Sequence, residues 1–198
     1  MIEDSKLKAI VVYSTRYGAT KGTSEEIARI LQENGFHVRV VDAKQERVQS
    51  IGEFDIIIVG SGIQMGKWTI ETEDFVKKFQ KELRVKKVAI FVSCGGANPL
   101  SEGEQKEKEM TDAKRKYLEK KAVELKISPV ALGFFGGCYD FNKMSWFFKK
   151  TLSSIKPKLE AAGYKETKVG VYDLRDLNGI RNWAKEVAKM ANEKGDFD

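Results

Sequence analysis

Histidine, cysteine and long apolar runs are scarce in this chain of 198 residues. The single histidine, His37, falls in a predicted edge strand, which leaves a Ser-His-Asp triad without a base. Two cysteines, Cys94 and Cys138, cannot form a disulfide framework or, with one histidine, complete a usual structural zinc site. No apolar run approaches membrane-spanning length, and the first residues lack the basic-then-apolar order of a secretory signal. We therefore expect a cytoplasmic protein without a metal site.

Glycine is also sparse in the first strand-to-helix turn, where only Gly18 occurs. A dinucleotide-binding fingerprint needs three glycines there, so a Rossmann dehydrogenase is disfavoured. The turn over residues 60–68 has three residues between Gly62 and Gly66, whereas a nucleotide-triphosphate loop needs four. The first strand ends in Tyr13-Ser14 rather than in the carboxylates that hold magnesium in a phosphoacceptor domain.

The hydrophobic pattern predicts one α/β domain over residues 1–198. Most of the apolar runs lack alternation, as expected for strands that are buried on both faces of a parallel sheet. Segments with the periodicity of amphipathic helices lie between these runs, and Asn34-Gly35 is expected to end the first helix. Predicted strands cover 9–13, 37–42, 55–60, 88–93 and 129–136, and predicted helices cover 21–33, 70–83, 104–125 and 177–192. We interpret the charged stretch 104–125 as a solvent-exposed surface helix.

Three turns follow the first, third and fourth predicted strands and are expected at the carboxyl edge of the sheet, where such folds bind ligands. The first, residues 14–20, places hydroxyls and one glycine at the start of a helix, whose free amides and dipole favour a phosphate group. The second, 60–68, and the third, 93–98, are rich in glycine and could lie flat against a planar ring. An ordinary capped helix start is the alternative for the first turn.

These three turns resemble the phosphate loop and the two isoalloxazine loops of the flavodoxin-like family over nearly the whole chain. The resemblance implies a doubly wound parallel five-stranded sheet of order 2-1-3-4-5, with helices on both faces and an insertion that splits the fifth strand. Within that family, residues 14–20, the second turn with Phe75-Val76-Lys77-Lys78, and residues 174–188 are similar to the menaquinone-dependent protoporphyrinogen IX dehydrogenases.

The family resemblance implies FMN as the cofactor and assigns its contacts. It implies that the first turn contacts the phosphate of FMN and that the second and third turns contact opposite sides of the isoalloxazine ring. The implied contacts are Ser14, Thr15, Arg16, Tyr17, Gly18, Ala19 and Thr20; Ser61, Gly62, Ile63, Gln64, Met65, Gly66 and Trp68; and Ser93, Cys94, Gly95 and Gly96. The third turn has no aromatic residue, although flavodoxins commonly stack one there, so we expect that side of the ring to be open.

Single residues in these turns have alternative interpretations. Trp68 is either a stacking partner of the ring or a core aromatic that covers a helix. Cys94 and Cys138 follow neighbouring strands and are either a redox pair or two inert thiols, and inert thiols are the commoner case.

The insertion, residues 138–168, carries much of the net charge of +6. Between Phe141 and Lys168 it has seven lysines against two glutamates. One helical side would carry Met144, Phe147, Phe148, Thr151, Leu152 and Ile155, flanked by Trp146, with Lys149, Lys150 and Lys156 for the other side. Such a helix either contacts a membrane at the inner face or packs on the sheet and exposes its lysines to water.

Two functions fit these observations best. The first is an FMN-dependent oxidoreductase that resembles protoporphyrinogen dehydrogenases, takes electrons from an anionic reduced substrate such as a porphyrinogen and passes them to a quinone. No side-chain acid or base is evident, so the flavin would carry the chemistry. The second is a flavodoxin-type carrier that serves redox protein partners. A docking module without flavin is a third alternative. Nucleic acid is not an expected partner, because no recognition motif accompanies the positive charge.

Overall fold

The computed structural model describes residues 6–144, 146, 150 and 154–193, without the side chain of Gln64. Five parallel strands have the order β2-β1-β3-β5-β6, and the short β4 pairs antiparallel with the end of β3. The strands are β1 (Lys8–Ser14), β2 (His37–Asp42), β3 (Ile56–Gln64), β4 (Lys67–Trp68), β5 (Lys87–Ser93) and β6 (Ala131–Phe135). The predicted fold class and strand order are confirmed.

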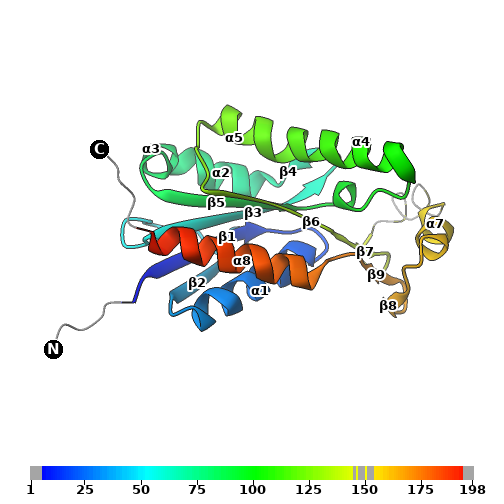
Figure 1. Cartoon of the computed structure of the whole chain (residues 1–198), viewed down its shortest axis with the longest axis horizontal. Coiled ribbons are helices and arrows are strands. Elements are labelled where there is room, and N and C mark those ends of the chain that lie inside the picture. Colours follow the sequence, from blue (N-terminus) through cyan, green and yellow to red (C-terminus); the bar gives the residue numbers. More distant parts are fainter. Residues whose placement is uncertain (1–5, 145, 147–149, 151–153, 194–198) are drawn as a thin grey trace.

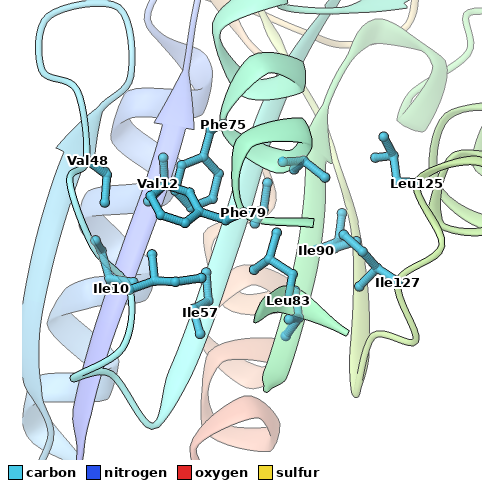
Figure 2. Packing of buried hydrophobic residues seen from close by; sticks show 14 of the residues in the cluster. Ile10, Val12, Val48, Ile57, Phe75, Phe79, Leu83, Ile90, Leu125 and Ile127 are labelled. Carbon is cyan, nitrogen blue, oxygen red and sulfur yellow. The ribbon is translucent and has the colours of Figure 1, made fainter. Parts of the chain in front are cut away.

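Each central strand contributes alternate residues to two cores, as the unbroken apolar runs predicted. In β1, Ile10 and Val12 belong to one core, while Ala9 and Val11 belong to the other. Figure 2 shows the first of these cores, where Phe75 and Phe79 lie over the strands. The three central strands are thus fixed in register by burial on both faces.

Helices cover both faces of the sheet (Figure 1). One face packs α1 (Ala19–Glu33) and α8 (Leu177–Asn192). The helical elements on the other face are α2 (Ile70–Lys78), α3 (Gln80–Leu83), α4 (Gly103–Lys114), the π-helical η2 (Arg115–Glu119) and α5 (Lys120–Leu125). The apolar residues Ile180, Trp183 and Val187 of α8 are buried against this face, whereas Met190 is 36% exposed.

The predicted surface helix over 104–125 is surface-exposed only in its first half. Helix α4 has no buried residue, in agreement with the prediction. In the second half Leu118, Ala122 and Leu125 are buried in the first core, so the interpretation of the whole stretch as a solvent-exposed face is wrong. The cause is an apolar stripe at i, i+4 and i+7, which the high density of charged residues concealed.

After β6 the chain leaves the parallel sheet and builds a second, antiparallel sheet at the carboxyl end of the strands (Figure 1). This sheet has the order β7-β9-β8, and α7 lies beside it. Its elements are β7 (Cys138–Asp140), α7 (Ile155–Ala161), β8 (Glu166–Lys168) and β9 (Val171–Asp173). The strand that follows the insertion, β9, therefore pairs with β7 and not with the edge of the main sheet, so it does not continue the fifth strand.

The amphipathic interpretation of the insertion is tested at few positions. Met144 is buried and Ile155 is partly buried, which fits packing on protein, whereas the Trp146 side chain is 76% exposed. Lys150 and Lys156 are exposed, and the other members of the proposed helix, Phe147, Phe148, Lys149, Thr151 and Leu152, lie outside the described residues. Within the described part of the chain, no helix is both long and apolar enough to cross a membrane. Membrane contact stays a prediction.

Candidate functional site

The first turn leads from β1 into α1 and leaves the start of the helix without a side-chain cap. Gly18, the residue that precedes α1, has a left-handed φ of 98° and no side-chain cap hydrogen bond forms there. The Gly18 N–H donates to Thr15 Oγ1 at 3.0 Å, so the Thr15 hydroxyl shapes the turn. The first turn of α1 also contains no acidic residue. Uncapped amides at the positive end of a helix dipole suit an anion.

A cavity of about 330 Å³ opens beside this turn, at the carboxyl ends of β1, β3 and β5. All three glycine-containing turns contribute to it, as the topology predicted. Its lining residues are Thr15, Arg16, Tyr17, Ala19, Thr20, Gly62, Ile63, Met65, Ser93, Cys94, Gly95, Gly137, Cys138, Tyr139 and Met144. The turns lie close together, because a Cβ at Gly62 would come within 3.1 Å of Thr20 Oγ1.

The charge of the cavity lining is positive. Among the described residues that line it, Arg16 is the only ionic one and none is acidic. A larger hollow of about 650 Å³ lies between residues 43–48 and α2, but Glu46, Glu71 and Asp74 line it alongside its cations. The smaller cavity is therefore the better site for an anionic ligand.

Ser93 supplies a polar group that the protein itself leaves unsatisfied. Its Oγ is buried and has no hydrogen-bond partner within the described structure, and the residue lines the cavity. Buried hydroxyls normally have a partner, so this one fits a site that a polar ligand completes.

Two hydroxyls that were predicted to face the ligand are engaged elsewhere. Ser14 is buried, and its Oγ donates to Glu71 Oε2 at 3.1 Å. Ser61 Oγ accepts from the Thr69 N–H at 3.0 Å and lies 3.2 Å from Thr69 Oγ1. Neither residue lines the cavity. Of the remaining predicted contacts, Gly18, Gly66, Trp68 and Gly96 are also not among the described lining residues, and the side chain of Gln64 lies outside the described part of the structure.

Trp68 occupies the core and not the cavity. Its side chain is 5% exposed, belongs to the first core, and donates from Nε1 to the Tyr117 carbonyl oxygen at 2.8 Å. The core interpretation of Trp68 is therefore the one its burial supports, and ring stacking by this residue has no support in its position.

The β3–β4 hairpin brings a strained residue to the rim of the cavity. Met65 and Gly66 have φ values of 50° and 74°, between the paired residues Gln64 and Lys67. Both positions of such a tight turn favour glycine, asparagine or aspartate, so a methionine is unusual there. Met65 is 81% exposed and lines the cavity, which makes it available to a ligand or partner.

Sequence reasoning missed Tyr139, which comes from the second sheet. A Cβ at Gly95 would lie 2.5 Å from Tyr139 Oη, so the phenol lies directly against the third turn. Burial raises the pKa of Tyr139. The expectation that this side of the ring is open rested on the third turn alone, and Tyr139 brings an aromatic side chain to that turn from another segment. The available signal was Gly136-Gly137 directly before Cys138-Tyr139, since two glycines allow the chain to pass close to the third turn.

The two cysteines both line the cavity as free thiols. Burial raises the pKa of Cys94 to about 11, and burial followed by the charge of Asp173 raises the pKa of Cys138. Thiols with raised pKa values are protonated and poorly nucleophilic at neutral pH, which favours the inert interpretation. No cluster of three or more histidine, cysteine or acidic residues that could hold a metal occurs in the described part of the chain.

Comparison with known proteins agrees with this geometry. The chain is 26% identical over 184 residues to a protoporphyrinogen IX dehydrogenase [quinone] from Leishmania major, covering 92% of this chain and 75% of that protein. It is 21% identical over 187 residues to the protoporphyrinogen IX dehydrogenase [quinone] of Escherichia coli K12, covering 94% and 98%.

Solved structures show the same fold. A flavodoxin from the domain Archaea superposes with a TM-score of 0.54 at 18% identity, covering 94% of this chain and all of that one. The two-electron reduced flavodoxin of Megasphaera elsdenii gives 0.54 at 15% identity, covering 91% and 98%. The family model of the flavodoxin domain matches residues 10–167. With its strand order, its site at the carboxyl edge and this match over most of its length, the chain belongs to the flavodoxin domain family.

Proposed function

We propose that the chain binds FMN in the 330 Å³ cavity and acts as an FMN-dependent oxidoreductase. One observation carries the proposal: an uncapped helix start and two glycine-rich turns meet in one cavity, and no carboxylate is among the described residues that line it. Family membership supports a flavin as the ligand.

The phosphate end of FMN would lie at the first turn. The amides at the start of α1 and the Thr15 and Thr20 hydroxyls can donate to a phosphate, and Arg16 adds a positive charge. The Thr15 hydroxyl can accept from Gly18 and still donate, because a hydroxyl does both.

The ring end would lie between the second and third turns. Gly62 and Gly95 keep the backbone accessible there, Ser93 offers its unpaired hydroxyl, and Tyr139 supplies an aromatic face. Met65 at the rim can cover an apolar edge of the ring. Trp68 has no part in this arrangement.

The chain's own residues bind and orient in this scheme, and none moves a proton. The lining residues that the structure describes include no carboxylate or histidine, and the raised pKa values of Cys94, Cys138 and Tyr139 keep these groups protonated near neutral pH. When bound, FMN supplies the redox chemistry by accepting and releasing electrons.

The substrate that we propose is a protoporphyrinogen-type anion, with a quinone as electron acceptor. Support comes from the relatives named for this reaction, which align over more than 90% of this chain. The net charge of +6 also favours an anionic substrate.

The test has two stages. The purified protein should be yellow or should bind FMN in calorimetry, and it should then oxidise protoporphyrinogen in the presence of a menaquinone analogue. A colourless protein that binds no FMN would refute the site. Binding without turnover would refute the enzyme and leave an electron carrier.

The carrier is the second candidate, and the solved neighbours named as flavodoxins favour it. A carrier needs only an exposed flavin edge and a docking surface, which agrees with the absence of acid or base groups from the described lining. Reduction by a redox partner protein, without turnover of a porphyrinogen, would distinguish it from the enzyme.

A further inference from the structure

A lysine of the insertion reaches the first turn. Lys143 Nζ lies 3.7 Å from the position that a Cβ on Gly18 would occupy, and Gly18 is the residue that precedes α1. The Lys143 side chain is 61% exposed and forms an ion pair of 3.1 Å with Asp140 Oδ2. An ammonium group therefore lies beside the same uncapped helix start to which the proposed function assigns the phosphate of FMN.

The backbone around Lys143 is held firmly. The Lys143 N–H donates to the Asp140 carbonyl oxygen at 3.1 Å, and the Asn142 N–H donates to Asp140 Oδ1 at 3.1 Å. The Phe141 N–H donates to the Gly170 carbonyl oxygen at 2.9 Å, which ties this turn to the second sheet. The adjacent Met144 is buried and lines the cavity. The insertion thus fixes the base of the lysine while its flexible end points at the first turn.

We propose that Lys143 is a phosphate-binding residue and makes the insertion a determinant of selectivity for FMN over riboflavin. This inference rests on the proposed function, because it assigns one further contact to that site. Arg16 belongs to the turn itself, whereas Lys143 approaches it from a different part of the chain, so a phosphate at this turn would meet cations from two separate segments.

Asp140 should weaken the contact between Lys143 and a phosphate. In the ligand-free protein its carboxylate neutralises Lys143, and a bound phosphate would compete for the same ammonium group. The side chain of Asp140 is only 10% exposed, so its negative charge is poorly screened and opposes a nearby phosphate. Substitutions at Lys143 and Asp140 should therefore change FMN affinity in opposite directions.

The experiment compares FMN with riboflavin, which has the same ring and no phosphate. Calorimetry or flavin fluorescence would give both dissociation constants for the wild type, Lys143→Gln and Asp140→Asn. A single exposed charge contact is expected to be worth about five-fold in affinity. Lys143→Gln should raise the Kd for FMN about five-fold and leave riboflavin unchanged, and Asp140→Asn, which keeps the acceptor for Asn142, should lower the Kd for FMN.

Lys156→Gln is the matched control, because Lys156 also lies in the insertion and pairs with a carboxylate, Glu166, at 2.8 Å. It should change neither constant, and thermal melting should show all three variants folded. An equal loss of both flavins in Lys143→Gln, no change in either, or a weaker FMN complex in Asp140→Asn would overturn the inference while the proposed function stands. A wild type that binds neither flavin would overturn both.

Discussion

The parallel sheet and the second sheet, which the insertion helps to form, differ in the size of the hydrophobic core that packs against them. Each face of the parallel sheet packs against an extensive apolar cluster, whereas the cluster of the second sheet contains three buried residues, Leu159, Tyr172 and Leu174, among those described. Nevertheless the second sheet and its flanking turns supply Tyr139, Met144 and Lys143 to the site. The difference indicates that most of the stability resides in the parallel sheet, while the weakly packed segment carries Lys143, to which we assign the selectivity for FMN.

Truncation of Phe91 in the parallel sheet should have the largest effect on the free energy of unfolding. Phe91 is fully buried, and its ring centroid lies 5.9 Å from that of Phe135 and 6.1 Å from that of Trp183. Phe91→Ala should lower the free energy of unfolding by about 3–5 kcal/mol, because it leaves a cavity between the strand and α8. Urea titration followed by circular dichroism measures this. Phe91→Leu is the control with a smaller cavity, and equal losses in both variants would contradict the packing argument.

A comparable truncation in the core of the second sheet should destabilise that sheet without destabilising the parallel sheet. Leu159→Ala removes a fully buried side chain from the three-residue cluster, at a local cost of about 2–4 kcal/mol. We expect amide exchange to accelerate in α7 and β9 while the unfolding midpoint of the parallel sheet changes little. FMN affinity should fall, because Tyr139 and Lys143 lose their support. A uniform rise of exchange throughout the chain would show that the two sheets unfold as one unit.

The contact between Gly95 and Tyr139 can be broken and restored. Gly95→Ala would place a Cβ 2.5 Å from Tyr139 Oη and displace the phenol, so we expect FMN affinity to fall roughly tenfold, equivalent to about 1.4 kcal/mol. Adding Tyr139→Phe removes the clashing oxygen and should recover much of that loss. Gly52→Ala is the control, because its Cβ would meet its nearest neighbour at 3.6 Å. Failure of the double variant to recover would place the damage elsewhere.

The smallest expected change in the free energy of unfolding concerns the ion pairs of Glu26 with Arg29 and Arg181, which join α1 to α8. Hydrogen bonds from Arg29 and Arg181 lower the pKa of Glu26 to about 2. The Glu26 side chain is 16% exposed and lies 2.7 Å from Arg29 Nη2. Glu26→Gln should cost about 1 kcal/mol at neutral pH, because the arginines are partly exposed and screened.

The pH dependence of this effect has a definite sign. The folded pKa of Glu26 is depressed, so its stabilisation is complete above about pH 4.5 and is lost as the pH falls toward 2. The stability difference between wild type and Glu26→Gln should vanish over that range in urea titrations at several pH values. Glu53→Gln, which removes an exposed pair with Lys8, should show little difference at any pH. A difference that persists at pH 2 would rule out the charge as its cause.

Local patterns predicted the parts of the molecule that depend on neighbours in sequence. Runs of β-branched residues predicted the parallel strands, because burial on both faces leaves no polar alternation. The apolar stripe over 177–192 predicted the bounds of α8. The three turns were located because parallel strands bring their carboxyl ends to one edge. The first turn, with Gly18 before α1, was correctly placed for the same reason.

What the sequence determined by itself is the alternation of strands and helices, the helices on both faces and the edge where a ligand site forms, because these follow from hydrophobic periodicity and strand-to-helix connections. The strand order was implied by the resemblance to the flavodoxin-like family. Only the tertiary structure decided which side chains reach that site. It put Trp68 in the core, directed Ser14 to Glu71, and brought Tyr139 and Lys143 from the insertion to the turns. Such contacts depend on how distant segments pack, and no local spacing encodes them.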